Sequence, residues 1–270
     1  MGIDLRTRSS DGWSEEEEWL LSNIPHVTGA LSILGSAFIV YDVASDRNKW
    51  FSTYHRLMFG MGSLDFVGSC ALALSTLPMP AESGKYSFGN SASCSVQGFF
   101  VQLNIGSPLY NLTLSIYFLL VVTYKWRMDD IRKKVEIWLH LFPLLWAFVT
   151  SLVGLTQKSF NDSAVWCWIA PAPTGCVDDP YIECDRCPYF KQYRWVFYYG
   201  PLWVAMVGIM IATGILVNSV RKTEKNAAKW RPSSVIDQVE REGRTPRANA
   251  AIIEERRKKR KARRMTRAVT

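Results

Sequence analysis

Residues 195–220 read WVFYYGPLWVAMVGIMIATGILVNSV, a stretch of 26 residues without a charged side chain. As a helix, a stretch of this length is long enough to cross the roughly 30 Å hydrocarbon core of a bilayer. The chain repeats this pattern, because none of its 32 Lys and Arg residues lies in any of five apolar stretches. Helices of soluble proteins carry charges along one face instead. The five stretches are residues 24–43, 57–77, 96–124, 137–155 and 195–220.

The five stretches predict membrane-spanning helices rather than strands. A backbone in hydrocarbon has no water to bond, and a helix satisfies its N–H and C=O groups within one segment. Strands of a membrane barrel are shorter and alternate between apolar and polar residues, and these stretches do not alternate. We therefore expect an all-α membrane protein, an antiparallel bundle of five transmembrane helices. Proline should kink three of the helices, at Pro108, Pro143 and Pro201.

The segments between the stretches alternate in charge, which predicts the orientation of the bundle. The first loop, the third loop and the C-terminal segment hold 25 of the Lys and Arg residues, and the other three segments hold 7. Basic residues collect on the cytoplasmic side of a membrane. We therefore expect residues 1–23 outside the cell, residues 24–220 in the plasma membrane, in contact with lipid, and residues 221–270 as a basic tail in the cytoplasm.

The cysteines agree with this orientation. Five of the six lie on the predicted outer side, where the surroundings are oxidising. Five cysteines cannot all pair with one another, so at least one is free or pairs with another chain. The spacing Cys184-x-x-Cys187 also occurs in zinc sites, but the loop holds no histidine, and we expect no metal site. The outer cysteines are Cys94, Cys167, Cys176, Cys184 and Cys187.

Two sequons for N-linked glycosylation occur in the chain. Asn161-Asp-Ser lies in the long loop on the predicted outer side, and we expect a glycan at Asn161. Asn111-Leu-Thr lies in the middle of the third apolar stretch, where we expect no modification.

Two local motifs sharpen this interpretation. The segment Ala92-Ser-Cys-Ser-Val-Gln-Gly-Phe-Phe-Val-Gln102 opens the third predicted helix, and Val165-Trp-Cys-Trp-Ile169 lies in the long loop before the fifth. Both segments resemble the corresponding parts of the cyclic-AMP-receptor-like G-protein-coupled receptors of slime moulds, fungi and protists. The resemblance covers residues 24–231. It implies the first five helices of a seven-helix receptor fold, with a disulfide between Cys94 and Cys167 that ties the loop to the third helix.

The resemblance also implies a function, namely signal reception at the cell surface. Its expected partners are an extracellular ligand and a heterotrimeric G protein. No sixth apolar stretch follows residue 220, so we expect a receptor chain truncated after the fifth helix or a five-helix derivative. A non-signalling membrane partner and a transporter fragment stay open as alternatives. A transporter typically carries ionisable groups at mid-membrane in related halves.

Five polar residues form the candidate ligand pocket. Asp65 is an acid in the middle of a span, and a carboxylate in the bilayer is costly unless it has a partner, a proton or water. The residues Asn104, Ser107, Tyr110 and Asn111 recur at three- to four-residue spacing, which places them on one helix face. In a receptor this face lines the central cavity. The alternative is hydrogen bonding between helices.

The loop after the third stretch carries five basic residues. Two interpretations remain open. The residues contact a G protein, or they attract anionic lipid, a contribution of about 1 kcal/mol per residue near the membrane surface. The five residues are Lys125, Arg127, Arg132, Lys133 and Lys134.

Other classes of function are not indicated. The sequence holds no metal-ligand cluster, nucleophile arrangement or phosphate-binding loop, and His26, His55 and His140 are far apart in it. We therefore expect neither an enzyme nor a cofactor. The net charge of +8 comes from the tail and the predicted inner loops, so nucleic-acid binding is not indicated either.

Overall fold

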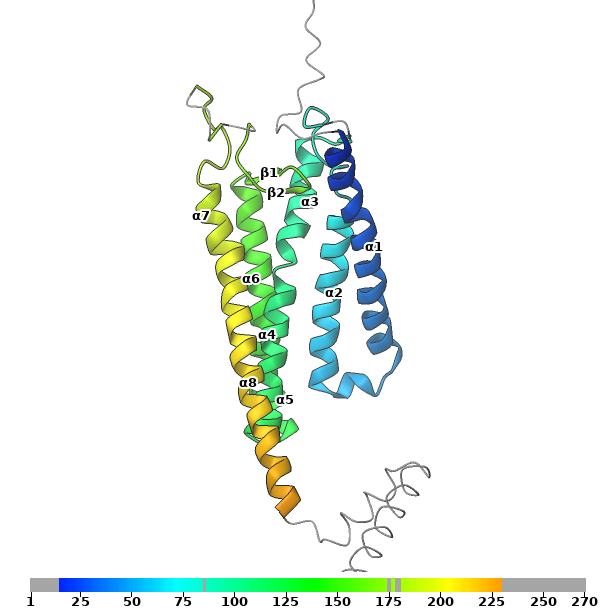
Figure 1. Cartoon of the computed structure of the whole chain (residues 1–270), viewed down its shortest axis with the longest axis vertical. Helices are drawn as coiled ribbons and strands as arrows, with labels where there is room; N and C mark the ends of the chain where they lie inside the picture. Colours follow the sequence, from blue (N-terminus) through cyan, green and yellow to red (C-terminus); the bar gives the residue numbers. More distant parts are fainter. Residues whose placement is uncertain (1–14, 85, 174–175, 178–180, 230–270) are drawn as a thin grey trace, which may run out of the picture. The chain divides into compact units, whose positions relative to one another are not determined.

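The computed structural model describes residues 15–84, 86–173, 176–177 and 181–229, where the chain forms an all-α membrane helical bundle with one small hairpin (Figure 1). Residues 1–14 and 230–270, which include much of the predicted N-terminal segment and tail, lie outside the described residues. The chain divides after Val217 into two compact units, and the bundle belongs to the first. The helices are α1 (Glu15–Ser45), η2 (Lys49–Phe51), α2 (Thr53–Ala73), α3 (Ser91–Leu103), α4 (Gly106–Phe118), η3 (Leu119–Thr123), α5 (Met128–Lys134), α6 (Glu136–Thr156), α7 (Phe190–Arg194), η4 (Trp195–Tyr199) and α8 (Gly200–Lys229).

Helices α1 and α2 pack closely because small residues face each other at their contact. A Cβ atom on Gly29 would lie 2.6 Å from the Cβ atom of Ala73, which is too close for any side chain. The hydroxyls of Ser32 and Ser69 share a hydrogen bond of 2.7 Å, and His26 Nδ1 lies 2.5 Å from the Ala73 carbonyl oxygen. Small residues let membrane helices approach, and polar bonds between the helices then add stability.

The third span is interrupted in the middle, where Pro108 predicts a kink. Proline has no N–H, so the carbonyl oxygen of Asn104, four residues earlier, loses its helical donor. The N–H of Ser107 donates to that oxygen instead, over 3.1 Å, in a tight turn that separates α3 from α4. At the other end of α3, the Asn90 side chain accepts hydrogen bonds from two N–H groups of the first turn. This cap explains why the helix begins before the predicted residue 96.

The last span contains a π-helical turn, η4, between α7 and α8. Pro201 accounts for the irregularity, since it cannot donate to the carbonyl oxygen of Phe197. Two side chains from neighbouring spans donate to this oxygen, Gln102 Nε2 at 3.3 Å and Trp146 Nε1 at 3.4 Å. The Phe197 carbonyl oxygen, which lacks its usual helical donor, therefore links three spans through side-chain hydrogen bonds. Pro143, in contrast, lies within the continuous helix α6.

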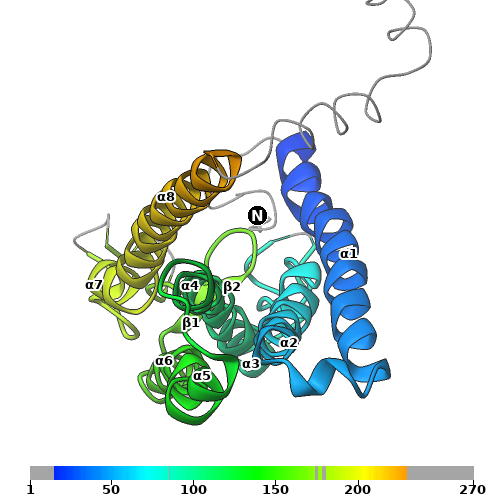
Figure 2. The same ribbon diagram turned by 90° about the horizontal axis from the view of Figure 1, so that it is seen from below.

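Four helical spans among the described residues are long and apolar enough to cross a membrane, namely α1, α3 with α4, α6, and α7 with α8. The helix α2, expected as a further span, has 21 residues but is less apolar, because it carries Arg56 and Asp65. It packs against α1 on one side and against α3 and α4 on the other (Figure 2). Its place in the bundle supports its assignment as a membrane-spanning helix, the second along the chain, which brings the number of spans among the described residues to five.

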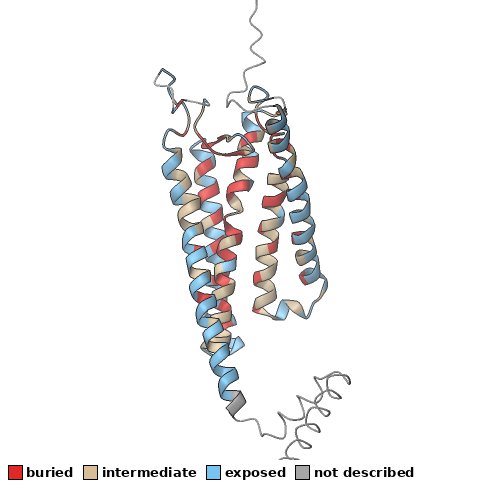
Figure 3. Cartoon of the chain, viewed as in Figure 1, coloured by how far each residue is buried: buried red, intermediate tan, exposed pale blue. Residues whose placement is uncertain are grey.

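The long loop before the last span contains a β-hairpin that the sequence analysis did not predict. Strands β1 (Phe160–Asp162) and β2 (Cys167–Ile169) pair antiparallel, with Asn161 opposite Trp168. Three-residue strands are too short to show an alternating pattern in a sequence. The hairpin is buried, in contrast to the mostly exposed α1 (Figure 3). We call this end of the bundle the hairpin end.

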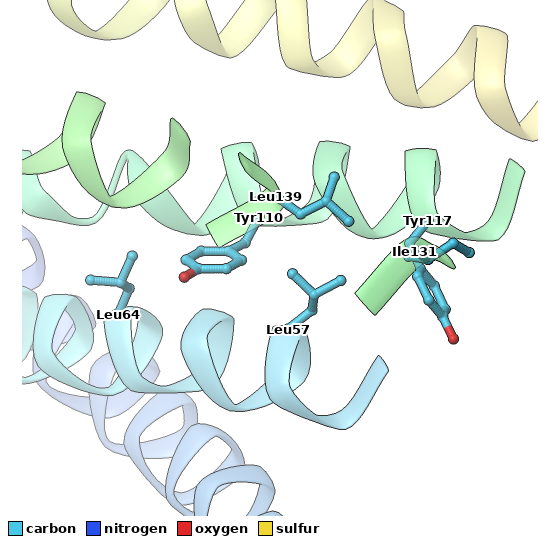
Figure 4. Packing of buried hydrophobic residues seen from close by; sticks show 6 residues of the cluster. All are labelled: Leu57, Leu64, Tyr110, Tyr117, Ile131 and Leu139. Atoms are coloured by element: carbon cyan, nitrogen blue, oxygen red, sulfur yellow. The ribbon is translucent and has the colours of Figure 1, made fainter. Parts of the chain in front are cut away.

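The opposite end, which holds η2 and α5, we call the basic end. A hydrophobic cluster there joins α2, α4, α5 and α6. Tyr110 points from α4 toward α2 within this cluster (Figure 4). The buried members of the cluster are Leu57, Leu64, Tyr110, Tyr117, Ile131 and Leu139.

Candidate ligand site and its loops

A disulfide attaches the hairpin to the third span. Cys94 in the first turn of α3 is bonded to Cys167 of β2, and both residues are buried. This is the pair that the family resemblance implies. Gln97, one turn further along α3, holds the same strand, because its Oε1 accepts a hydrogen bond of 2.9 Å from the Cys167 N–H. Its Nε2 donates to the carbonyl oxygens of Ala71 and Ser75.

Gln102 holds the hairpin a second time, deeper in the bundle. Its side chain is fully buried, with an exposed fraction of 0%. Its Oε1 accepts a hydrogen bond of 3.0 Å from the Trp168 indole, and its Nε2 donates to Thr150 Oγ1 at 3.2 Å and to the Phe197 carbonyl oxygen. A buried amide is costly unless its bonds are made. One side chain thus joins α3, the hairpin, α6 and η4.

An aromatic cluster with a central arginine completes the attachment. The Trp168 ring packs edge-on against Tyr198 and Tyr199, with ring centres 5.0 Å and 5.7 Å away. The Arg194 guanidinium lies 5.0 Å from the centre of the Trp168 ring, and its Nε donates to the Ile169 carbonyl oxygen at 2.6 Å. A cation over an aromatic face is stabilising. Arg194 therefore connects the start of the last span to the hairpin.

The remaining outer cysteines form one disulfide and one free thiol. Cys176 is bonded to Cys184, and Cys187 is unpaired and buried among the hairpin side chains. Since Cys184 is in a disulfide, it cannot serve as a zinc ligand, and no group of three potential ligands occurs within the described residues. Burial raises the pKa of the Cys187 thiol, although Ser159 and Arg194 act in the opposite direction.

Three of the candidate pocket residues, Asn104, Ser107 and Tyr110, contact α2. The Asp65 carboxylate interacts with the Ser107 side chain. Asn104 packs against Gly68, where a Cβ atom would lie 2.4 Å from Asn104 Cγ. The contact between Asp65 and Ser107 is of the kind expected from the alternative, hydrogen bonding between helices. The Oδ1 atom of Asn104 is nonetheless buried without a hydrogen-bond partner in the described part of the chain, so one acceptor remains available.

Asn111 differs from the neighbouring pocket candidates in its exposure to solvent. It is exposed, whereas Ser107 and Tyr110 are buried, with exposed fractions of 5% and 1%. Ser107 and Asn111 both lie in α4, four residues apart, so the interruption before α4 does not separate their faces. Tyr110 and Asn111 are also neighbours in sequence, and so lie about 100° apart around the helix axis. Asn111 thus lies at the exposed edge of this polar stripe, and its place in a ligand pocket stays a prediction.

A polar chain leads from Tyr110 to the basic end. The Tyr110 hydroxyl is 3.1 Å from His140 Nδ1, and His140 Nε2 is 3.9 Å from Glu136 Oε1. Two residues of α2 donate hydrogen bonds to the Glu136 carboxylate. Arg56 donates through Nε and Nη2, and the Thr53 hydroxyl donates at 2.8 Å. Bidentate pairs of this kind are among the stronger hydrogen-bonded contacts. These polar contacts connect α4, α6 and α2 between the middle of the spans and the basic end.

The five basic residues of the third loop lie in and before α5, and all five are exposed. Only one of them, Lys134, forms an ion pair in the described part of the protein, with Asp130 at 3.7 Å. The exposed residues are Lys125, Arg127, Arg132, Lys133 and Lys134.

The structure disagrees with the predicted glycan at Asn161. This residue lies in β1 with an exposed fraction of 6%. Its Nδ2 atom donates to the carbonyl oxygens of Lys158 and Ala170, at 3.2 Å and 2.7 Å. A glycan would be attached to this same nitrogen in place of one of its two hydrogens, and would break at least one of these bonds. The sequon motif carries no information about this burial.

Sequence reasoning gave no role to several residues that hold the site together. Gln97 and Gln102 are two of the four side-chain amides in the third apolar stretch, and amides within a membrane span are a signal for buried hydrogen bonds. Arg56 and Glu136 were visible as opposite charges at the same end of two spans. Their partners depend on tertiary contacts, which spacing along the chain does not show.

No family model and no curated protein matches the sequence. Among solved structures, the fold is similar to the crystal structure of squid rhodopsin, with a TM-score of 0.59 and 15% sequence identity. The match covers 85% of this chain and 60% of the squid rhodopsin chain. The chain thus has a fold similar to that of squid rhodopsin and spans about three fifths of that neighbour. The narrower cyclic-AMP-receptor-like assignment stays a prediction.

Proposed function

We propose that this chain is the receptor-type transmembrane part of a G-protein-coupled signalling protein. One observation carries the proposal, namely a rhodopsin-like bundle whose hairpin is disulfide-bonded to the third span at Cys94. Under this proposal, residues 1–23 and the hairpin end face outward, residues 24–220 lie in the plasma membrane, and residues 221–270 are cytoplasmic. The charge distribution of the loops supports this orientation.

The proposed ligand contacts lie below the hairpin, where α2 meets the third span. Asn104 offers an unpaired buried acceptor, and Asp65 and Ser107 add polar groups on the same contact between helices. A ligand that bonds Asn104 Oδ1 breaks no existing hydrogen bond of that atom, but α2 must move away from the third span at Gly68 to admit it. Tyr110 lies next on this face and begins the polar chain to His140 and Glu136. We infer that ligand binding shifts the polar contacts of Tyr110, His140 and Glu136, and thereby changes the conformation of the basic end.

A signalling assay that needs no known ligand tests the proposal. The protein is expressed with each class of Gα subunit, and basal dissociation of tagged Gα from Gβγ is followed by resonance energy transfer. For at least one Gα class, we expect more basal dissociation of Gα from Gβγ than in mock-transfected cells. The Tyr110→Phe variant should change the amount of this dissociation. Surface expression without a response for any class would contradict the proposal and favour the non-signalling membrane partner.

A further inference from the structure

The basic end carries a surface that combines cations with exposed aromatic rings. It directly follows the end of the third span at Thr123. We call it the basic-aromatic surface and define it by the exposed residues Tyr124, Lys125, Trp126, Arg127, Arg132 and Lys133.

The cations of this surface are available for an outside partner. Within the described residues, no carboxylate lies at ion-pair distance from Lys125, Arg127, Arg132 or Lys133. Three other cations at the basic end are engaged by carboxylates of the protein itself. These pairs are Arg56 with Glu136, Lys49 with Asp42, and Lys134 with Asp130.

The rings of this surface are exposed at the place where the membrane ends. Tyr124 is 62% exposed and Trp126 is 42% exposed, and Phe51 in η2, also at the basic end, is 71% exposed. Trp and Tyr are enriched at the boundary between headgroups and water, because each ring has an apolar body and a polar edge. An exposed Phe ring is stabilised in the same layer. The chemistry of the rings therefore matches that of the lipid interface.

The surface is held in place by contacts with the bundle. Ile131, on the inner side of α5, has an exposed fraction of 0%. The backbone N–H of Trp126 donates to the Leu120 carbonyl oxygen at 3.0 Å, and the Tyr117 hydroxyl donates to Met128 Sδ at 3.5 Å. A surface that is already ordered pays little entropy when it binds.

We propose that the basic-aromatic surface binds the anionic headgroups of phospholipids, with its rings inserted in the headgroup layer. The cations stand immediately after a membrane span, at headgroup depth, where anionic lipid is the anion that always adjoins them. Clusters of Lys and Arg next to a span attract such lipids. This inference does not depend on the proposed receptor function, because it concerns lipid retention alone.

Lipid titration of the full-length protein tests the proposal. The protein in mild detergent is titrated with phosphatidylserine or with phosphatidylcholine, and bound lipid is counted by native mass spectrometry. The variant Arg132→Gln/Lys133→Gln is compared with Lys158→Gln/Lys191→Gln, whose two lysines are exposed at the hairpin end. A second variant, Lys125→Gln/Arg127→Gln, covers the case that the first does not fold.

We expect phosphatidylserine to bind more tightly than phosphatidylcholine, and each removed cation to weaken it about fivefold. The hairpin-end control should bind both lipids as the unchanged protein does. Equal binding of the two lipids, or full phosphatidylserine binding by both basic-end variants, would overturn the proposal. If those variants keep the lipid but lose association with Gα subunits, the surface serves a protein partner and the lipid inference is wrong.

Discussion

The Trp168 indole and Gln102 Oε1 form a hydrogen bond of 3.0 Å that is buried beneath the hairpin. The bond connects a loop at the hairpin end to the centre of the third span. Together with the disulfide at Cys94, it fixes both the position and the depth of the hairpin. The hairpin is therefore part of the helical core and not a loose cover over it.

Replacement of Gln102 by leucine should destabilise the bundle. The change keeps the size of the side chain but leaves the Trp168 indole N–H buried without an acceptor. An unpaired buried group of this kind costs about 1–3 kcal/mol in the free energy of unfolding. Thermal unfolding in detergent measures the loss. The control Gln157→Leu replaces an exposed glutamine and should change stability by less than about 0.5 kcal/mol.

The Arg56–Glu136 pair should behave as one unit in a charge-swap experiment. Removing one partner of a fully buried pair lowers the free energy of unfolding by about 3–5 kcal/mol. Removing Arg56 or Glu136 should lower it by less, because both side chains retain some exposure to solvent. Arg56→Glu and Glu136→Arg should each lower thermal stability, and the double variant should recover most of the loss. If the two single effects simply add in the double variant, the two residues do not interact.

The spans were readable from the sequence because charge exclusion is a property of each stretch on its own. Irregularities inside the spans were partly readable, since Pro108 and Pro201 predict where a helical bond is lost. Which atoms replace that bond, such as Gln102 Nε2 at the Phe197 carbonyl oxygen, depends on the neighbouring span. Spacing places Ser107 and Asn111 on one face of α4, but it does not show that the neighbouring spans bury the first and leave the second exposed. The hairpin formed by Phe160–Asp162 and Cys167–Ile169 arises from tertiary attachment, without a local pattern.

Cys187 should react slowly with alkylating reagents in the folded protein. Burial raises the pKa of its thiol above the ordinary value of 9.0, so little of the reactive thiolate exists at neutral pH. Labelling by N-ethylmaleimide in a Cys70→Ala background should be slow until denaturant is added. The contribution of the protonated thiol to stability is present below pH 9.0 and is lost as the pH rises through the raised pKa.

A comparison with Cys187→Ala across this pH range isolates the effect. The stability of the unchanged protein should fall more steeply at alkaline pH than that of the variant. Rapid labelling of the folded protein at neutral pH would show that the thiol is not buried as described.

Asn161 should carry no glycan. Its Nδ2 atom is engaged by the Lys158 and Ala170 carbonyl oxygens, so a sugar cannot be attached without opening the hairpin. Glycosidase treatment should leave the mass of the protein from eukaryotic cells unchanged, and Asn161→Gln should run at the same mobility. The Asn161→Gln variant should also unfold at a lower temperature, because both hydrogen bonds are lost. A glycosidase-sensitive mass that disappears in this variant would contradict the described strand.

The orientation of the bundle underlies both the receptor proposal and the assignment of the two ends, and cysteine labelling on intact cells tests it most directly. Exposed lysines are replaced one at a time, Lys158→Cys at the hairpin end and Lys133→Cys at the basic end, in a background without Cys70 and Cys187. A membrane-impermeant maleimide should label the first variant on intact cells and the second only after permeabilisation. Labelling of Lys133→Cys on intact cells, with Lys158→Cys protected, would contradict the account.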